Sequence, residues 1–246
     1  MDLGLAGRTA LVTASSKGLG RGSALALGAE GVNVVLCARS KDDLDRAADA
    51  VGEVAAGRGA AVHAVVTDVT TADAPARLVA ETMERFGSLD ILVANSGGPP
   101  RATALEIDDQ AILDAVNGNL LTTVRLVREA VPHMRTAGWG RIVAITSYSI
   151  KQPIPNLALS NLARTGLWAW AKTAAQDLFA DGITLNLACP GLHATERVTG
   201  LGIAPGTPLG DPDDFGRVVA FLCSHSARFV TGTALAVDGG AVLGLL

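Results

Sequence analysis

The sequence predicts an α/β protein: one doubly wound domain with a seven-stranded parallel sheet covered by helices on both faces. Short β-branched runs alternate with longer Ala-rich amphipathic segments, as in a chain of strand–helix–strand units. The short runs are apolar throughout, as expected of strands buried on both faces. No linker, repeat or low-complexity tract interrupts the 246 residues, of which 49% are hydrophobic, so residues 1–246 are expected to form a single domain.

The expected strands, taken in order, cover residues 9–13, 32–37, 61–66, 91–94, 141–146, 183–187 and 234–237. Segments of helical character lie between them, for example residues 41–56 and 74–86. Gly87 follows the second of these directly, which is typical of a helix C-terminus. Residues 190–212, rich in Gly and Pro, follow a strand's carboxyl end, where open α/β sheets bind ligands. They are expected to form a substrate loop or lid.

Composition and charge exclude several classes of function. The net charge of −4, with no Lys/Arg cluster, argues against a nucleic-acid partner. No apolar run approaches the roughly 20 residues that span a bilayer, and the first residues contain no basic segment, so a soluble, cytoplasmic protein without a membrane partner is expected. Cys37, Cys189 and Cys223 are far apart and lack metal-ligand spacing. They are expected to be buried free thiols, and no metal site is expected.

The segment at the end of the first strand indicates a dinucleotide site. It contains Thr13, Ser15, Ser16, Lys17, Gly18, Leu19 and Gly20 and opens a helix. Glycines there let the backbone approach a pyrophosphate, and the helix N-terminus supplies free N–H groups and the positive end of its dipole. A Gly-x-Gly alone can be a tight turn. Its place at the first strand–helix junction favours a Rossmann-type nucleotide-binding domain.

The end of the second strand bears on which cofactor is bound. An acidic residue about 20 positions after the glycines would hold the ribose 2′-hydroxyl of NAD(H), but Arg39 and Ser40 stand there instead. Arg39 and Lys17 can flank an adenosine 2′-phosphate. NADP(H) is therefore favoured over NAD(H), the alternative being that both side chains are ordinary surface cations.

On these residues the chain resembles the short-chain dehydrogenase/reductase family over essentially its whole length, close to the 3-oxoacyl-acyl carrier protein reductase branch. The family's Thr-Gly-x-x-x-Gly-x-Gly is similar to residues 13–20, with Ala14 in place of the first glycine. The resemblance implies that the remaining cofactor contacts come from Asp68, Val69, Asn95, Gly97, Pro190, Gly191 and Thr195. It also implies that Asn119 and Ser147 belong to the catalytic centre.

The catalytic pair of the family is missing. Its Tyr-x-x-x-Lys, thirteen residues after the serine, corresponds here to Ser160 and Arg164. The i, i+4 spacing keeps both on one helix face, but a serine hydroxyl is far less acidic than a phenol of pKa about 10, and an arginine stays protonated. Arg164 can still bind ribose hydroxyls or a substrate oxygen, with Ser147 and Ser160 as further donors. The alternative is a helix-surface arginine.

Two other side chains are candidate proton donors. Tyr148, the chain's single tyrosine, follows Ser147, with Lys151 or Arg164 available to tune it. It enters the pocket if the chain turns sharply after the strand, and points away from Ser147 if the strand continues. His193 has a pKa suited to general acid catalysis. The favoured interpretation is a surface or packing role for Tyr148 and a solvent-exposed loop residue for His193.

Three functions follow from this sequence. The leading hypothesis is an NADP(H)-dependent oxidoreductase acting on a carbonyl or alcohol, with a small-molecule or acyl-thioester substrate. The alternatives are a dinucleotide-binding regulator without turnover and a lyase or isomerase on the same fold. A homodimer or homotetramer is expected through helices at residues 111–134 and 157–178. Trp168 and Trp170 are candidate anchors there, although core packing is the rival explanation for one of them.

Overall fold

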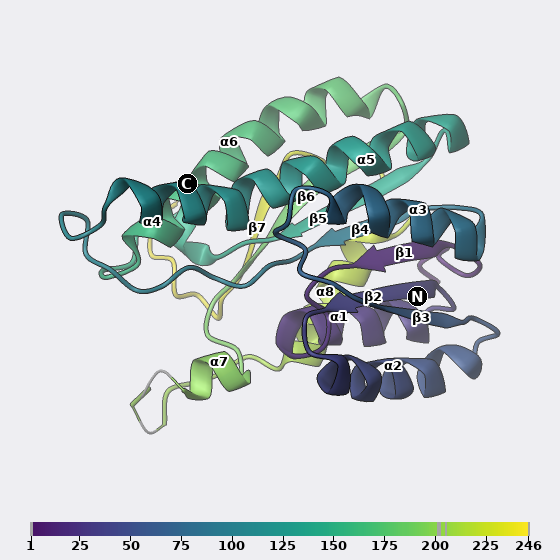
Figure 1. Cartoon of the computed structure of the whole chain (residues 1–246), viewed down its shortest axis with the longest axis horizontal. Helices are drawn as coiled ribbons and strands as arrows, with labels where there is room; N and C mark the ends of the chain where they lie inside the picture. Colours follow the sequence, from purple (N-terminus) through teal and green to yellow (C-terminus); the bar gives the residue numbers. More distant parts are fainter. Residues whose placement is uncertain (1, 201–202, 205, 246) are drawn as a thin grey trace.

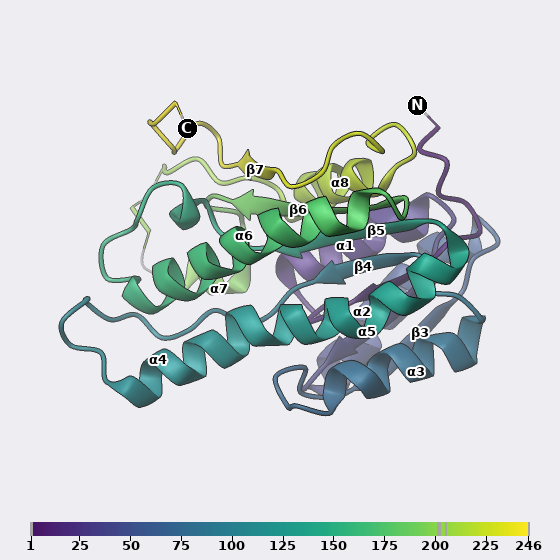
Figure 2. The same ribbon diagram turned by 90° about the horizontal axis from the view of Figure 1, so that it is seen from above.

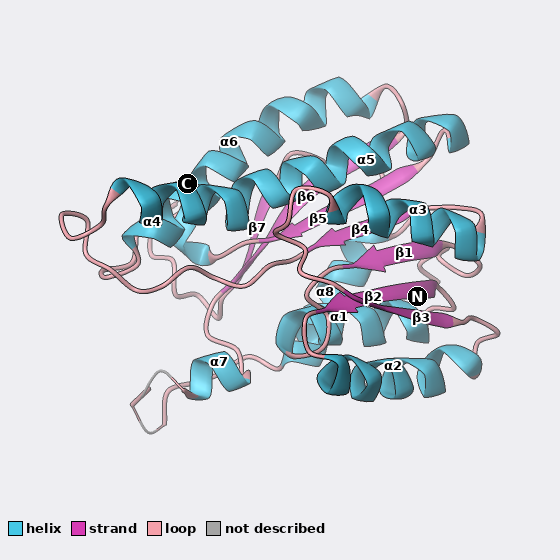
Figure 3. Ribbon diagram, viewed as in Figure 1, coloured by secondary structure: helices cyan, strands magenta, loops and turns pink. Residues whose placement is uncertain are grey.

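The computed structural model describes residues 2–200, 203–204 and 206–245 of the chain. Within them a seven-stranded sheet has the order β3-β2-β1-β4-β5-β6-β7, and every neighbouring pair is parallel (Figures 1 and 3). The strands are β1 Thr9–Val12, β2 Asn33–Ala38, β3 Val62–Val66, β4 Ile91–Ala94, β5 Gly140–Ile145, β6 Ile183–Pro190 and β7 Ala234–Val237. The predicted fold class is confirmed.

The predicted strands agree with the observed ones except at their ends. The largest difference is in β6, which continues to Pro190 instead of ending at residue 187. Its last residues pair with β7, Cys189 with Ala236 and Pro190 with Val237. Pairing with β7 therefore extends β6 as far as a proline. A proline argues against a strand when the sequence alone is considered.

The helices form two layers. They are α1 Gly18–Ala29, α2 Lys41–Ala56, α3 Ala74–Phe86, α4 Asp109–Val116, α5 Thr122–Ala137, α6 Ala158–Phe179, α7 Glu196–Thr199 and α8 Pro212–Cys223, with a π-helical turn at Asn117–Leu121 and a 3-10 turn at Tyr148–Ile150. Helices α1, α2 and α8 cover one face of the sheet, and α3, α5 and α6 cover the other (Figure 2).

Each face of the sheet has its own apolar core, because successive side chains of a strand point to opposite faces. In β1, Leu11 packs in the core beneath α3, α5 and α6, whereas Ala10 and Val12 pack in the core beneath α1, α2 and α8. Phe215 of α8 is the largest fully buried side chain of the second core. Burial on both faces explains why the strand segments are apolar at consecutive positions.

The strand order reverses next to β1, whose neighbours are β2 and β4. Such a reversal leaves a crevice at the carboxyl ends of the strands, where this class of fold binds ligands. The loops after β1, β4, β5 and β6 all emerge at this edge, and α7 stands at the same end of the molecule (Figure 1). None of the helices described is long and apolar enough to cross a membrane.

Candidate active site

The glycine loop between β1 and α1 is held in place by the loop after β4. The Thr13 hydroxyl donates to the Asn95 carbonyl oxygen (2.7 Å) and accepts the Asn95 backbone N–H (2.8 Å). The Asn95 side-chain amide also donates to the Ala14 carbonyl oxygen (3.1 Å). Ala14 has a φ of 46°, a left-handed conformation that favours the glycine normally found there. Thr13 and Asn95 therefore fix the shape of the loop rather than line the cavity beside it.

Ser15 differs from the expectation of a cofactor-binding side chain. It is fully buried, and its Oγ accepts the Cys37 backbone N–H at 3.1 Å. Its own backbone N–H donates to the Cys37 carbonyl oxygen at 3.0 Å. These hydrogen bonds hold the glycine loop to β2, and the Ser15 side chain therefore points away from the crevice.

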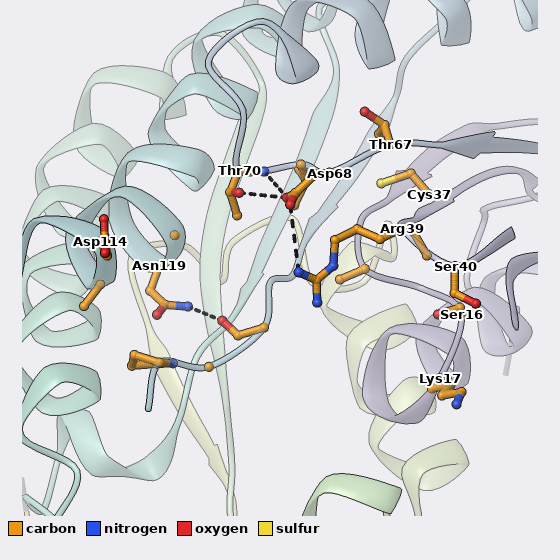
Figure 4. Close-up of a pocket in the computed structure, with 18 of the residues that line it drawn as sticks. Ser16, Lys17, Cys37, Arg39, Ser40, Thr67, Asp68, Thr70, Asp114 and Asn119 are labelled. Atoms are coloured by element: carbon orange, nitrogen blue, oxygen red, sulfur yellow. Dashed lines mark hydrogen bonds and ion pairs between the residues drawn. The ribbon is translucent and has the colours of Figure 1, made fainter. Parts of the chain in front are cut away.

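A cavity of about 850 Å³ lies along the carboxyl edge of the sheet (Figure 4), within the usual range for cofactor and ligand sites. Seven of the predicted site residues line it: Ser16, Lys17, Arg39, Asp68, Val69, Gly97 and Asn119. The walls also include residues that the sequence prediction missed, among them Thr67, Thr70, Gly98, Pro99, Pro100, Ala111, Asp114, Ala115 and Leu159. The Gly-Gly-Pro-Pro run after β4 was the one sequence signal for this wall.

One end of the cavity carries the two predicted cations. Arg39 reaches toward its centre, and its Nη1 lies 3.9 Å from Asp68 Oδ2 (Figure 4). Lys17 Nζ is already paired, with Asp43 Oδ2 at 3.2 Å and Glu196 Oε2 at 2.9 Å. Arg39, whose side chain is 79% exposed, is therefore the cation better placed to meet an anionic ligand.

Asp68 and Val69 lie where β3 ends. The Asp68 carboxylate accepts the backbone N–H of Thr70 (3.0 Å) and its hydroxyl (2.7 Å). These two hydrogen bonds, and then the positive charge of Arg39, hold the pKa of the Asp68 carboxyl below its ordinary value. Asp68 is thus an ionised hydrogen-bond acceptor at neutral pH beside the apolar Val69, a pairing suited to an adenine ring.

Asn119 lies in the π-helical turn between α4 and α5. It is buried, and its side-chain amide donates to the Ser96 hydroxyl and to the Gly97 carbonyl oxygen, both at 2.8 Å. The π-helical turn thus interrupts the predicted helix over residues 111–134 at this residue. Such turns inside α-helices are frequent at functional sites. Asn119 therefore links the helix layer to the loop after β4.

The three other predicted catalytic residues, Ser147 after β5 and Ser160 and Arg164 on α6, are not among the residues that line the cavity. Ser147 caps the 3-10 turn, and its Oγ accepts the Ser149 backbone N–H at 3.1 Å. Ser160 and Arg164 project from α6, and Arg164, only 7% exposed, donates from Nη1 to the Ile145 carbonyl oxygen at 3.1 Å. Burial, and after it the positive charge of Arg197, lowers the pKa of the Arg164 guanidinium to about 10. It remains a cation at neutral pH, and it is not a surface arginine.

The alternative proton donors are placed differently. The chain does turn sharply after β5, so Tyr148 starts a 3-10 turn and is half-buried. Lys151 lies 5.3 Å above the ring of Trp168 rather than beside the cavity. His193 is buried, with its ring edge-on to Phe215 at 5.2 Å and in close contact with Gly210. The structure therefore gives His193 a packing role, and the favoured sequence interpretation of a solvent-exposed loop histidine is wrong.

Residues 190–212 contain α7 and also the positions 201, 202 and 205, which lie outside the described residues. Gly191 extends the pairing of β6 with β7, because its backbone N–H donates to the Val237 carbonyl oxygen. Thr195 caps α7 and lies against the glycine loop, since a Cβ on Gly18 would be 3.2 Å from its Cγ2. The predicted lid segment thus begins over the predicted pyrophosphate site.

The fold and the crevice define a nucleotide-binding protein of the Rossmann class, and comparison with known proteins narrows this. The family model described as Enoyl-(Acyl carrier protein) reductase matches residues 13–242. The chain is 36% identical to a 3-oxoacyl-acyl-carrier-protein reductase of Synechocystis, over 97% of this chain and 98% of the relative. It is 30% identical to dehydrogenase/reductase SDR family member 4 of Homo sapiens, over 96% and 88%.

Two solved structures agree with this. L-sorbose reductase from Gluconobacter frateurii, complexed with NADPH and L-sorbose, is 31% identical, with a TM-score of 0.91 and 100% of both chains covered. A variant of actinorhodin polyketide ketoreductase with NADPH is 29% identical, with a TM-score of 0.88 and 96% and 98% covered. The chain belongs to the short-chain dehydrogenase/reductase family of oxidoreductases.

Proposed function

We propose that this protein is an NADP(H)-dependent oxidoreductase that interconverts a carbonyl and an alcohol. The observation that carries the proposal is the 850 Å³ cavity at the strand-order reversal, with Arg39 where an NAD(H) site would place an acid. Arg39 and Ser40 are assigned to the adenosine 2′-phosphate, and Asp68 and Val69 to the adenine. The glycine loop with Gly18, Leu19 and Gly20, and the segment with Pro190, Gly191 and Thr195, are assigned to the rest of the cofactor.

The cofactor supplies or accepts the hydride, and the protein positions and polarises the substrate. Because the Ser147 Oγ accepts a backbone N–H, its hydroxyl hydrogen is free to be donated to a substrate oxygen. Ser160 offers a second hydroxyl from the facing helix. Arg164, cationic and buried, stabilises negative charge that develops on that oxygen. With no tyrosine at position 160, we assign the proton to water held by these hydroxyls.

Known relatives support carbonyl reduction as the reaction class. L-sorbose reductase and actinorhodin ketoreductase both carry NADPH in their solved structures, and several relatives are 3-oxoacyl-acyl-carrier-protein reductases. The substrate is accordingly proposed to be a small carbonyl compound or an acyl thioester.

Fluorescence titration with NADPH and NADH in parallel tests the cofactor, and nicotinamide absorbance with ketones and 3-oxoacyl thioesters tests turnover. Tighter binding of NADPH, with turnover that falls at least tenfold in Ser147→Ala and is unchanged in the exposed Ser226→Ala, supports the proposal. If neither nucleotide binds, the cofactor assignment is wrong.

The second candidate is a regulator that binds the dinucleotide without turnover. Its support is Arg164, which donates to the Ile145 backbone instead of pairing with a tyrosine. Tight NADPH binding without consumption of any carbonyl in the same experiment would favour it.

We also propose a cytoplasmic homodimer or homotetramer. The helices expected to form the subunit contact carry exposed apolar side chains. These are Leu113 of α4, Leu121 of the π-helical turn and Leu162 of α6. Trp168 and Trp170 are half-buried and pack against the core of their own subunit, which leaves the leucines as the better anchors. Three buried free thiols suit a reducing compartment. Light scattering of the purified protein determines the oligomeric state.

A further inference from the structure

Besides Arg164, a second arginine, Arg197, lies against the loop that follows β4. Arg197 of α7 places its guanidinium directly against Gly98, so that a Cβ on Gly98 would overlap it. Gly98 follows β4, and β4 pairs with β5. At the end of β5 lies Arg164, which bonds the Ile145 carbonyl oxygen. The two arginines thus lie beyond the ends of adjacent strands, one on the lid segment and one on α6.

Neither arginine has an acidic partner among the described residues. Arg164 is 7% exposed, and a buried charge is ordinarily paired. Their charges also act on each other, because Arg197 contributes to the lowered pKa of Arg164. Two unpaired like charges, one of them buried, are unfavourable unless an anion lies between them.

An oxyanion fits this arrangement, because each guanidinium presents a planar fork of donors that matches a carboxylate or a phosphate. Two sources exist for it: a substrate carboxylate or the cofactor's pyrophosphate. The pyrophosphate site predicted at the glycine loop lies at the end of β1, on the far side of β4 from Arg164. Ser147, by contrast, follows the same strand as Ile145. Arg164 therefore lies beside the reacting oxygen. Arg197 also adjoins the glycine loop, because Thr195 lies against Gly18 and Glu196 pairs with Lys17, so the test must separate a substrate carboxylate from the pyrophosphate.

We propose that Arg164 and Arg197 form a subsite for a carboxylate carried by the substrate, so that the preferred substrates are oxo acids or hydroxy acids. This rests on the proposed oxidoreductase function and names its substrate class. Because Arg197 belongs to α7 and already lies against Gly98, a bound carboxylate also holds α7 against the loop after β4.

The test compares acids with their methyl esters, using pyruvate, acetoacetate and levulinate. With NADPH, kcat/KM for the best acid is expected to exceed that of its ester at least tenfold. Arg197→Gln is expected to reduce this ratio by about tenfold or more, which is the usual effect of losing a hydrogen bond to a charged group. The control, Arg217→Gln, removes an exposed arginine of α8 and should leave the ratio unchanged.

A second readout needs no turnover. In the NADP⁺ complex the acid should raise the Tm more than the ester does, and Arg197→Gln should abolish the difference. This separates the subsite from the reaction, because an acid-specific rise in Tm without any NADPH consumption supports the subsite while refuting the reductase. An equal effect of acid and ester overturns the subsite. So does an Arg197→Gln variant that weakens NADPH binding at an unchanged acid-to-ester ratio, because the arginine then serves the pyrophosphate.

Discussion

Individual charges at the crevice determine what this site can bind. Arg39 stands where an acidic side chain would accept the ribose hydroxyls of NAD(H), and its ion pair with Asp68, at 3.9 Å, is long. Lys17, by contrast, is engaged with Asp43 and Glu196. The proposed selectivity for the 2′-phosphate therefore depends mainly on Arg39.

Replacing Arg39 tests this selectivity. Arg39→Gln should weaken NADPH binding by about tenfold or more, because a charge-assisted hydrogen bond to phosphate is lost, and should leave NADH binding nearly unchanged. Parallel fluorescence titrations measure both. Arg58→Gln, an exposed arginine after α2, is the matched control. Equal weakening of both nucleotides would show that Arg39 does not contact the phosphate.

Burial of Arg164, at the proposed catalytic centre, lowers the stability of the fold. Holding its charge in the interior, where its pKa is about 10 instead of 12.5, disfavours folding by on the order of 3 kcal/mol. Arg164→Met should raise the free energy of unfolding at pH 7 by roughly 1–3 kcal/mol while reducing turnover. Urea denaturation checks this. The gain should not vary below about pH 9, where both the folded and the unfolded states keep the arginine protonated. A lower free energy of unfolding in Arg164→Met would mean that the bond to Ile145 outweighs the cost of burial.

Among the elements, the crossing of α1 and α8 brings the backbones closest together. A Cβ on Gly216 would overlap the Gly22 carbonyl oxygen, and one on Gly22 would overlap the Pro212 carbonyl oxygen. Small residues at both positions let α8 lie on α1 and cover the core under Phe215. Since α8 directly follows the lid segment, this contact also fixes where the lid returns to the domain.

Gly216→Ala should lower the free energy of unfolding by about 2 kcal/mol or more, because backbone on both sides of the contact must move. Gly52→Ala is the matched control. It lies within α2 with open space around the added Cβ, and it should raise stability by about 0.5–1 kcal/mol through helix propensity. Urea denaturation of the two variants beside the parent measures this contrast. Equal effects would show that the close contact is not maintained in solution.

At the scale of the whole molecule, two cores hold the sheet between helix layers, and the free thiols are sealed within them. Burial raises the pKa of Cys37 and of Cys223 to about 12, whereas an unfolded thiol titrates near 8.5. In alkali the unfolded chain therefore releases protons that the folded one keeps. The stability that these thiols contribute is complete below about pH 8.5 and is lost as the pH rises toward 12.

Unfolding free energies measured from pH 8 to pH 10 should therefore fall as pH rises. Cys223→Ala should flatten that slope by about 1 kcal/mol per pH unit above pH 9, because one raised pKa is removed. Arg164, with a folded pKa of about 10, starts to release its proton near pH 9 and partly opposes this fall, but it does so equally in the parent and in Cys223→Ala. An unchanged slope in Cys223→Ala would place that thiol in contact with water.

The sequence by itself determined the strands, the two-sided sheet and the glycine loop, because each depends on local patterns: consecutive apolar residues, helical periodicity, and glycines at a strand–helix junction. It also located Arg39 and the exchange of Tyr and Lys for Ser160 and Arg164, since spacing along the chain sets those positions. Only the tertiary structure decided what these side chains meet. It turned Ser15 inward, paired Lys17 with two acids, put a π-turn at Asn119 and packed His193 on Phe215. It also placed Arg197 of the lid segment and Arg164 of α6 at the ends of adjacent strands. That arrangement depends on how α6, α7 and the strands pack in space, and no local sequence pattern determines such packing.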